Sequence, residues 1–373
     1  MTRKRPTANI YIDLSLGYWG GAERRLARIC DYLISTCSSL ELSIMLRGAE
    51  ETTNSFSAQY FSGESVTHVT CVGSNLEAIT SLRSRRPNVF HFIDCSGRTL
   101  PIYLAARTIT RNLIMDVASF FLASGVYNSF LHKRAVNAVL RMCKAVTLLY
   151  PSKEAQFQKT IDAVGSSAKL KVAPNSFTDV DSFYPASIKQ NLVVFSGRLE
   201  EYKQPMLLLH AVLKNHDLLR KQGFRVVFCG EGSEKSKMVN FIETNRLADV
   251  VEVAGFVKAQ EFVNKSKIFF SIQKDDNYPS QALMEAISAG NYVVATNVGD
   301  TFRMVNSEFA KLVEPTSHDL SKALKEAISL VSTTETFEAI VSAARDFALS
   351  NFHIKKMAEH YNNLWLEVLG DNL

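Results

Sequence analysis

Two cations, Arg198 and Lys203, lie in one segment, SGRLEEYKQP, that follows a short apolar run at 192–195 and leads into a predicted helix. Arginine can donate two parallel hydrogen bonds to neighbouring oxygens, and lysine adds a mobile point charge. Two such side chains near a helix start are suited to binding a diphosphate. Surface charge without a ligand is the alternative interpretation when this loop is taken alone.

The segment from 274 to 300 predicts a loop, a helix, a tight turn, a buried strand and a glycine loop. Pro279 and Ser280 indicate the helix start, since proline suits a first turn and serine caps free N–H groups. Gly290 stands where a left-handed residue ends a helix. The helix therefore covers about 280–289, packs an apolar face on a sheet, and is followed by a strand at 292–295.

Carboxylates are concentrated around this helix without a structural need for them. Glu285 lies on the helix itself, and Asp275, Asp276 and Asn277 precede its N-terminus. A helix N-terminus attracts anions through its free N–H groups and its dipole. Hydrogen-bonding acidic residues beside an anion pocket suggest a ligand that carries both hydroxyls and phosphates.

Two glycine-rich loops follow other predicted strands. CGEGSE contains Gly230, and its glycines would let the backbone approach a ligand, although a simple turn is the more common meaning of such a string. GYWGGAERR places Gly20 and Gly21 at a helix start, which is again an anion-binding geometry. Neither loop reads GxGxxG, so a nicotinamide fingerprint is not supported.

Several other polar residues have both structural and functional interpretations. Asp116 follows the predicted strand 112–115, where a carboxylate is often functional but equally serves to cap a loop. His91, inside a strand, is interpreted as a hydrogen-bonded, semi-buried histidine. The DVD string at 179–181 resembles a metal-binding pattern, but its Pro/Ser-rich setting favours a capped turn. The aromatic and basic segment 118–141 is either a buried packing helix or a patch that lies on a membrane.

Strand-like and helical segments alternate along the whole chain, which predicts the α/β class with mostly parallel, doubly wound sheets. Strands are expected at 8–14, 42–46, 66–72, 89–93, 112–115, 145–149, 169–172, 192–195, 225–229, 250–254, 268–272 and 292–295. The connector 174–190 has two prolines and no apolar periodicity. It separates two Rossmann-like domains, predicted at 1–180 and 190–353, and an amphipathic helix is expected at 354–369.

Composition is that of an ordinary globular protein, with 373 residues of which 46% are hydrophobic and 21% charged. The six cysteines form no CxxC pair and accompany no histidine cluster, so neither a metal site nor a disulfide framework is expected. No signal peptide or membrane span is predicted, and a cytoplasmic location is expected. The net charge of +5 is concentrated in the N-terminal half, which can indicate an anionic partner such as a phospholipid surface.

Six motifs occur in order across nearly the whole chain: GGAER, PNSF, SGRLEEYK, CGEGSE, VVEVAGFV and DNYPSQALMEAISAGNYVVATNVGD. Together they resemble the retaining GT-B glycosyltransferases of family 4, also called glycosyl transferases group 1. The spacing of Arg198 and Lys203 resembles the GRLxxxK signature of that family. The helix with Glu285 resembles the second half of its E-x7-E motif. No single string is decisive.

The resemblance implies two Rossmann-like domains that face each other across a cleft, with a C-terminal helix, 354–373, returning to the N-terminal domain. It also implies donor-binding roles: Arg198 and Lys203 for the diphosphate and catalysis, Glu285 for the ribose, and the backbone near Val257 for the base. The loop from Asn277 through Tyr278, Pro279 and Ser280 to Gln281 would contact the sugar and phosphate, and Gly20, Gly21 and Gly230 would lie against the donor.

Two positions depart from the family pattern. The first Glu of E-x7-E is replaced by Asn277, with Asp276 beside it as a possible substitute. Asp116 stands where many relatives have a histidine that faces the sugar, so it is predicted to contact the donor as a catalytic residue. Both departures bear on the identity of the donor sugar more than on the type of reaction.

The predicted function is transfer of a hexosyl group, with retention, from a UDP- or GDP-linked sugar to a glycan or lipid-linked glycan in surface polysaccharide synthesis. No metal or other cofactor is expected, because side-chain cations and helix ends supply positive charge. A nucleic-acid partner is not indicated, whereas peripheral contact with the inner face of the cytoplasmic membrane is considered. The alternatives are a non-catalytic GT-B-like binding scaffold and a nucleotide-sugar epimerase or phosphorylase of the same fold.

Overall fold

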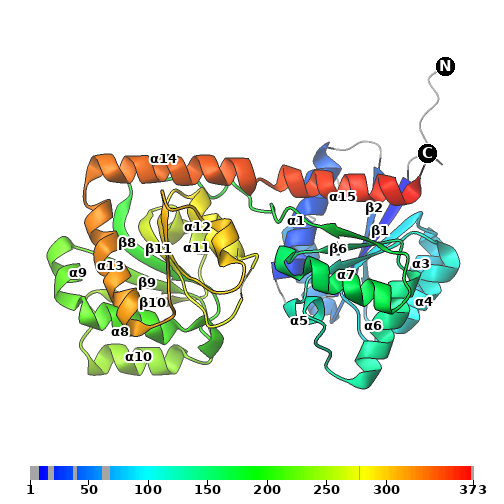
Figure 1. The fold of residues 1–373 in the computed structure, drawn as a ribbon, viewed down its shortest axis with the longest axis horizontal. Coiled ribbons are helices and arrows are strands. Elements are labelled where there is room, and N and C mark those ends of the chain that lie inside the picture. Colours follow the sequence, from blue (N-terminus) through cyan, green and yellow to red (C-terminus); the bar gives the residue numbers. More distant parts are fainter. Residues whose placement is uncertain (1–7, 16–20, 37–39, 61–67, 277, 371–373) are drawn as a thin grey trace, which may run out of the picture. The chain divides into compact units, whose positions relative to one another are not determined.

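The structure, a computed structural model, describes residues 8–15, 21–36, 40–60, 68–276 and 278–370. The chain divides into two compact units, and the helix and strand labels in Figure 1 identify each of them. Unit 1 consists of Met1–Phe177 and Ile354–Leu373, and unit 2 consists of Thr178–His353. Gly20 and Asn277, two of the predicted donor contacts, lie outside the described residues.

Unit 1 is built on a parallel sheet, of which seven strands lie in the described residues. They are β1 Ala8–Ser15, β2 Leu40–Arg47, β3 His68–Val72, β4 Val89–Ile93, β5 Leu113–Val117, β6 Ala145–Leu148 and β7 Lys169–Val172. The spatial order is β3-β2-β1-β4-β5-β6-β7. The central strands are apolar and largely buried because helices cover the sheet, as the short apolar runs of the sequence predict, whereas the edge strands β3 and β7 are partly exposed.

The helices of unit 1 alternate with its strands. They are α1 Gly21–Thr36, α2 Glu50–Tyr60, α3 Asn75–Arg85, α4 Leu100–Ile109, α5 Phe120–Ala123, α6 Phe130–Met142, η1 Pro151–Lys153, α7 Glu154–Ala163 and α15 Ile354–Leu369. α15, red in Figure 1, packs on α1 and β4. The predicted apolar face of this last helix is confirmed, since Met357, Tyr361, Leu364 and Val368 are all buried.

Unit 2 contains a second parallel sheet, with six strands in the described residues. They are β8 Gln190–Ser196, β9 Arg225–Cys229, β10 Val251–Gly255, β11 Ser266–Ser271, β12 Tyr292–Thr296 and β13 Ala310–Val313, in the order β10-β9-β8-β11-β12-β13. The sequence did not predict β13. Two doubly wound parallel sheets confirm the predicted α/β class.

The helices of unit 2 surround this sheet (Figure 1). They are η2 Glu201–Lys203, α8 Pro205–Lys214, α9 His216–Gln222, α10 Lys235–Thr244, α11 Ala259–Val263, α12 Gln281–Ser288, η3 Thr301–Met304, α13 Ser317–Val331 and α14 Thr334–Asn351. No helix among the described residues is both long enough and apolar enough to cross a bilayer.

The helix α12 confirms most of the local reasoning from sequence. Ser280 is its N-cap, and the hydroxyl oxygen accepts a hydrogen bond from the Leu283 N–H at 3.4 Å. Gly290 follows the helix end with φ of +70°, a conformation that suits glycine. Pro279 was expected in the first turn but precedes the cap, so it shapes the entry to the helix and not the helix itself.

Candidate functional site

Ligands of open parallel sheets bind beyond the carboxyl ends of the strands, at the point where the strand order reverses. In unit 2 this point lies between β8 and β11, since β9 and β10 extend the sheet on one side and β12 and β13 on the other. The loop after β8 carries Arg198 and Lys203, and the loop after β11 leads to Ser280. The backbone N–H of Lys274 donates to the carbonyl of Tyr202 at 3.0 Å, so the two loops are joined.

The two predicted diphosphate ligands both lie close to one aromatic ring. The guanidinium carbon of Arg198 and the ammonium nitrogen of Lys203 are each 5.5 Å from the centroid of the Tyr202 ring. Lys203 also donates to the side-chain oxygen of Gln273 at 2.8 Å. Burial, with a smaller contribution from the charge of Arg198, lowers the pKa of Lys203 to about 8. A bound anion would favour the charged ammonium and offset this cost.

The glycine loop after β9 supports the Arg198 loop by packing directly against it. A Cβ on Gly230, where φ is +145°, would lie 1.9 Å from the carbonyl oxygen of Gly197, and one on Gly232 would lie 2.3 Å from that of Leu199. The carboxylate of Glu200 accepts a hydrogen bond from the Ser233 hydroxyl at 2.6 Å. These glycines therefore permit contact between loops, and direct contact of Gly230 with a donor stays a prediction.

The acidic residues around α12 are held by the protein itself. The side-chain nitrogen of Gln281 donates to Glu285 at 2.8 Å, and Glu285 is half-buried one turn into the helix. Asp276 accepts hydrogen bonds from the N–H groups of Tyr278 at 2.9 Å and Asp300 at 3.4 Å. Asp276 thus orders the loop between β11 and α12, and a role in place of the missing first Glu is not tested by this geometry.

Val257 follows β10 at the same edge of the sheet and is 38% exposed. Its neighbour Phe256 is 91% exposed, the largest exposed fraction among the large hydrophobic side chains of the described residues. An apolar surface at this edge suits the flat face of a nucleobase. The predicted contact between Val257 and the base remains an expectation.

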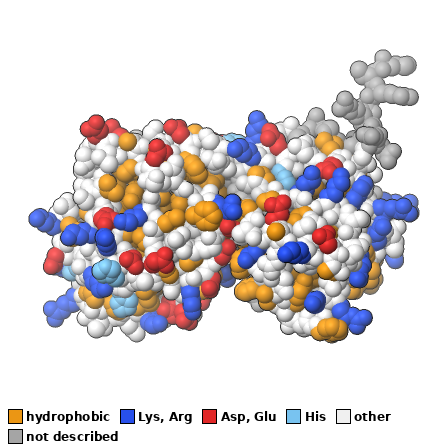
Figure 2. Space-filling model, in the orientation of Figure 1, with side chains coloured by type: hydrophobic (Ala, Val, Ile, Leu, Met, Phe, Trp, Pro, Cys, Tyr) orange, Lys and Arg blue, Asp and Glu red, His pale blue; other side chains and the backbone are white. Residues whose placement is uncertain are grey.

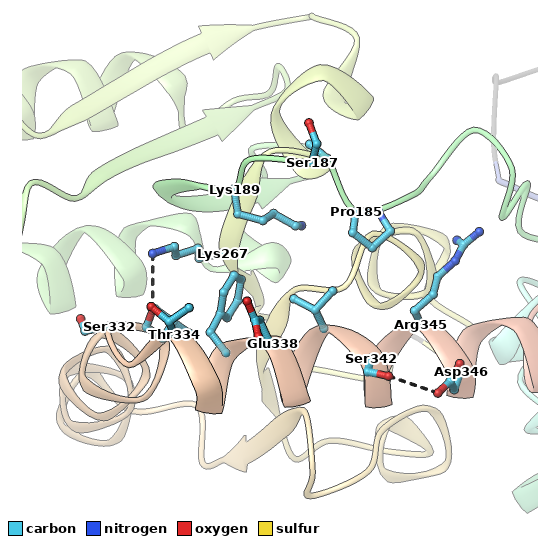
Figure 3. A pocket seen from close by; sticks show the side chains of 14 residues that line it. Pro185, Ser187, Lys189, Lys267, Ser332, Thr334, Glu338, Ser342, Arg345 and Asp346 are labelled. Carbon is cyan, nitrogen blue, oxygen red and sulfur yellow. Dashed lines mark hydrogen bonds between the residues drawn. The ribbon is translucent and has the colours of Figure 1, made fainter.

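A cavity of about 480 Å³ in unit 2 lies away from these loops. Figure 3 shows its wall along α14, with Lys189 and Lys267 at the starts of strands β8 and β11. The ammonium group of Lys189 donates to the carbonyls of Ser266 and Ala289, and burial lowers its pKa to about 7. None of the predicted donor-binding residues lines this cavity, so it is not the candidate site.

In unit 1 the strand order reverses between β1 and β4. The loop after β1 lies outside the described residues, and Gly21 begins α1 immediately beyond it. The residue after β4 is Asp94, which has φ of +47° although it is not a glycine. Such left-handed residues are uncommon and concentrate at functional sites. Asp94 is thus a candidate functional carboxylate at the carboxyl ends of the strands of unit 1, where the strand order reverses. We call this the ligand-binding edge of unit 1.

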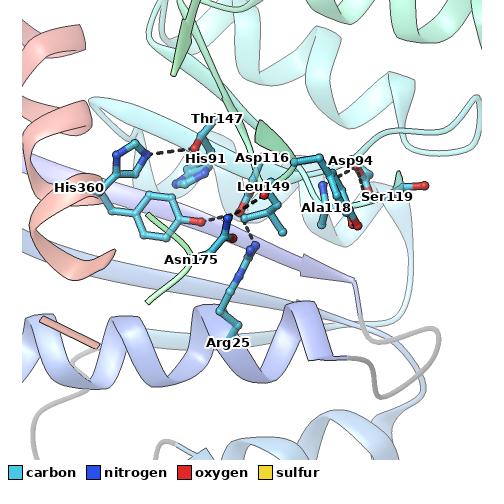
Figure 4. Close-up of polar contacts among 12 residues, drawn as sticks. Arg25, His91, Asp94, Asp116, Ala118, Ser119, Thr147, Leu149, Asn175 and His360 are labelled. Carbon is cyan, nitrogen blue, oxygen red and sulfur yellow. Dashed lines mark hydrogen bonds and ion pairs between the residues drawn. The ribbon is translucent and has the colours of Figure 1, made fainter. Parts of the chain in front are cut away.

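The carboxyl group of Asp94 is held in place from the neighbouring loop (Figure 4). One oxygen accepts hydrogen bonds from the N–H groups of Ala118 at 3.0 Å and Ser119 at 3.3 Å. Burial raises the pKa of Asp94 to about 7; the Asp116 carboxylate raises it further, whereas the hydrogen bonds and Arg25 lower it. Asp94 was not predicted from the sequence, where its position directly after the strand was the available signal.

Asp116 does not lie where the sequence predicted it. The strand β5 continues through Asp116 to Val117, and the side chain is completely buried. One carboxylate oxygen accepts hydrogen bonds from Arg25 at 2.6 Å and from the hydroxyl of Tyr361 at 2.5 Å (Figure 4). Its burial in an ion pair gives Asp116 a structural role in this arrangement, and its contact with the donor stays a prediction.

The ion pair of Arg25 and Asp116 belongs to a network that attaches α15 to the sheet. Trp365 donates from its indole nitrogen to Nδ1 of His91 at 3.2 Å, and a ring nitrogen of His360 lies 3.0 Å from the Thr147 hydroxyl. Burial lowers the pKa of His91 to about 3, so the ring is neutral and can accept this bond. The predicted hydrogen-bonded, structural role of His91 is confirmed, but the side chain is completely buried and not semi-buried.

The DVD string at 179–181 forms the capped turn that the sequence favoured. The carboxylate of Asp179 accepts hydrogen bonds from the Ser182 N–H at 3.1 Å and from its hydroxyl at 2.5 Å. Asp181 takes no part in these hydrogen bonds.

The fold is that of known GT-B glycosyltransferases. A glycosyltransferase from Rickettsia africae superposes with a TM-score of 0.78 over 99% of this chain and 100% of that chain, at 15% sequence identity. Anabaena HepE in complex with UDP superposes with a TM-score of 0.75 over 96% of this chain and 99% of that one, at 14% identity. Identities this low show the shared fold alone.

Sequence comparison adds a match to one family. Residues 176–346, which make up nearly all of unit 2, match the model of the family "Glycosyl transferases group 1". This match contains the loop that carries Arg198 and Lys203 and the helix α12 that carries Glu285.

Two curated proteins are also similar in sequence. A phosphatidylinositol N-acetylglucosaminyltransferase subunit of Arabidopsis thaliana is 25% identical over 236 residues, which cover 61% of this chain and 51% of that protein. The Campylobacter jejuni "GalNAc-alpha-(1->4)-GalNAc-alpha-(1->3)-diNAcBac-PP-undecaprenol alpha-1,4-N-acetyl-D-galactosaminyltransferase" is 29% identical over 96 residues, 26% of this chain and 25% of that protein. The matches thus span about half of the first relative and a quarter of the second.

Proposed function

We propose that this protein is a glycosyltransferase that moves a hexosyl group, with retention, from a nucleotide sugar to an acceptor hydroxyl. The observation that carries the proposal is the pair of cations, Arg198 and Lys203, at the strand-order reversal of a glycosyl transferases group 1 domain. Breaking the bond between sugar and phosphate builds negative charge on the leaving diphosphate. Fixed positive charge stabilises that transition state more than the ground state.

The donor is a UDP- or GDP-linked sugar in this proposal. The structure of HepE, which has the same fold, contains UDP, and this supports a uridine nucleotide as the donor. Glu285, on the helix beside the cation loop, would accept hydrogen bonds from the ribose hydroxyls. The two side-chain cations would neutralise the diphosphate without a metal ion.

The acceptor is a glycan carried on a lipid, as in the assembly of surface polysaccharides. Phosphatidylinositol and an undecaprenol-linked glycan appear in the names of the two curated relatives, and both are attached to lipid chains. An acceptor of this kind would bring the protein to the inner face of the cytoplasmic membrane as a peripheral protein.

Nucleotide titration tests this proposal against the non-catalytic alternative. We expect isothermal calorimetry to show binding of UDP or GDP to the full chain, and nucleotide release from the matching sugar donor when acceptor is added. A binding scaffold would bind neither nucleotide. A phosphorylase or an epimerase would form its product without transferring sugar to the added acceptor, which chromatography of the products would detect.

Asp94 extends this proposal to unit 1, where it would accept a hydrogen bond from an acceptor hydroxyl. Ala118 and Ser119 bind one carboxyl oxygen of the half-buried Asp94, and the other oxygen would receive the acceptor hydroxyl. The groups around Asp94 are Asp116 on β5 and Arg25 on α1, with the Tyr103 hydroxyl of α4 on its backbone carbonyl at 3.4 Å. The ionised form is the better acceptor of a hydroxyl hydrogen bond.

Asp94→Asn separates this role from folding, because Asn keeps the shape and tolerates a left-handed backbone. We expect kcat/KM for the acceptor to rise in the wild type as pH increases through about 7, as Asp94 ionises, and to stay low and flat in the variant. Nucleotide affinity should be unchanged. A variant with the wild-type acceptor profile would show that Asp94 does not bind the acceptor.

The same variant has a stability readout with a definite sign. The pKa of Asp94 is raised on folding, so its contribution to stability is present below the ordinary Asp value and is lost as pH rises through about 7. A neutral Asn escapes this loss. We therefore expect the free energy of unfolding of Asp94→Asn, measured in urea, to increase relative to that of the wild type between pH 5 and pH 8. The control Asp162→Asn, at an exposed position of α7, should not show this increase.

A further inference from the structure

The segment from α5 to the first turn of α6 exposes large apolar side chains that the fold does not cover. The exposed fractions are 67% for Phe121, 52% for Val126, 71% for Phe130 and 73% for Leu131. These four residues fall within eleven positions of the chain, whereas isolated exposed apolar residues are normal on any surface. Buried helix packing, one of the two interpretations of this segment from sequence, is wrong for these side chains.

The exposed side chains are held by ordered structure and form one surface. Leu122 of α5 is buried, and the N–H of Val126 donates to the carbonyl of Phe121 at 2.8 Å, which brings those two residues together. The Tyr127 ring lies 5.9 Å from that of His132, which connects this turn to α6. We call the surface made by Phe121, Val126, Phe130, Leu131, Lys133 and Arg134 the α5–α6 patch.

The α5–α6 patch combines apolar and positively charged side chains. Lys133 and Arg134 are exposed and lie over the rings of Tyr127 and Phe130, at 5.7 and 5.6 Å from the ring centroids. Lys153, from η1, lies 5.0 Å from the centroid of Phe120 at the base of the patch. Figure 2 shows hydrophobic and basic side chains together at the lower end of unit 1, where Figure 1 places α5 and α6.

The charge of the surrounding chain has a single sign. From Val117 to Lys153 the sequence contains five lysines and arginines and no aspartate or glutamate. A protein partner could bury the apolar residues without this excess of positive charge. Binding to an anionic surface, in contrast, depends on positive charge of this kind. Exposed aromatic and aliphatic side chains flanked by basic ones are the composition that binds the headgroup region of an anionic bilayer.

The α5–α6 patch is also attached to the ligand-binding edge of unit 1. Ser119, the N-cap of α5, donates its N–H to Asp94, and a ring nitrogen of His132 in α6 lies 3.1 Å from the carbonyl oxygen of Cys95. The elements that carry the patch are therefore fixed to the backbone at the β4 end. If the α5–α6 patch lay on a bilayer, the ligand-binding edge of unit 1 would lie close to that bilayer.

We propose that the α5–α6 patch docks the protein on the surface of an anionic phospholipid bilayer. The apolar side chains enter the headgroup region, and the basic side chains contact lipid phosphates. This docking does not depend on the transfer reaction, and it can be measured without a donor or an acceptor.

Sedimentation with vesicles tests the proposal on the full chain. We expect binding to vesicles of two parts phosphatidylcholine and one part phosphatidylglycerol, weaker binding at high salt, and little binding to phosphatidylcholine alone. The triple variant Phe121→Ser, Phe130→Ser, Leu131→Ser and the double variant Lys133→Glu, Arg134→Glu should each lower the partition coefficient by about tenfold or more.

Matched variants elsewhere on unit 1 serve as controls. Leu76→Ser with Leu104→Ser removes exposed apolar side chains, and Arg83→Glu with Arg111→Glu reverses exposed charges. Both controls should bind vesicles like the wild type. Equal loss in the controls, equal binding to neutral and anionic vesicles, or no vesicle binding at all would overturn the proposal. So would a patch variant that changes the oligomeric state and leaves vesicle binding unchanged.

Discussion

Replacing Arg198 and Lys203 together by alanine is expected to lower the rate of sugar transfer by on the order of 10²-fold or more. Both cations lie by the Tyr202 ring at the strand-order reversal of unit 2, where a leaving diphosphate would develop its charge. Their removal leaves that charge without a fixed counter-charge in the transition state. Steady-state nucleotide release with a saturating acceptor measures the effect.

The nucleotide-binding pattern of this variant identifies the part of the ligand that the cations contact. UDP or GDP should bind much more weakly to the variant, whereas uridine or guanosine, which lack phosphates, should bind equally to both proteins. A control that replaces Arg225 and Lys237, cations in exposed ion pairs on β9 and α10, should leave transfer unchanged. Normal turnover by the variant without Arg198 and Lys203 would refute the assignment.

Asp116→Ala is expected to cost about 3–5 kcal/mol in the free energy of unfolding, the largest stability effect that we predict. Burial by itself lowers the pKa of Arg25, but Asp116 and nearby acidic groups outweigh it and raise that pKa. Without the carboxylate, a guanidinium that is 2% exposed loses its ion-pair partner inside unit 1. Denaturant unfolding followed by circular dichroism would measure the loss.

The same chemical change at an exposed ion pair provides the control. Asp249→Ala removes the carboxylate that Arg220 and His216 contact at the surface of unit 2, where water screens the charges. We expect a much smaller change in unfolding there. If the two variants unfolded alike, the buried ion pair would not be the structural element that we describe.

Local signals in the sequence were sufficient for most of the secondary structure. Ser280 and Gly290 bracket α12 because capping and left-handed termination depend on residues within one turn of each other. Buried parallel strands such as Val89–Ile93, which is apolar apart from His91, appear as apolar runs for a similarly local reason. The strand β13, with the sequence AKLV, was missed, although β6 and β7, which are equally short, were predicted.

The candidate site was harder to predict from the sequence, because contacts between residues far apart in the chain determine the burial and charge of its side chains. Asp116 resembled a residue beyond the end of a strand, but a partner 91 positions earlier, Arg25, draws it into the core. Asp94 has no motif around it, and its left-handed backbone and raised pKa arise only when β5 and its loop lie alongside. The cation loop was found because both cations belong to one segment.

The docking of α15 has a consequence for the order in which the protein can fold during synthesis. Unit 2 is continuous, from Thr178 to His353, and its chain is complete before α15 is made. Unit 1 starts before unit 2, but Tyr361 and Trp365, the partners of Asp116 and His91, leave the ribosome after unit 2. Unit 1, which is translated before unit 2, can therefore complete its folding only after unit 2 has been made. Until α15 is synthesised, the surface of unit 1 on which it packs is exposed to chaperones and to aggregation.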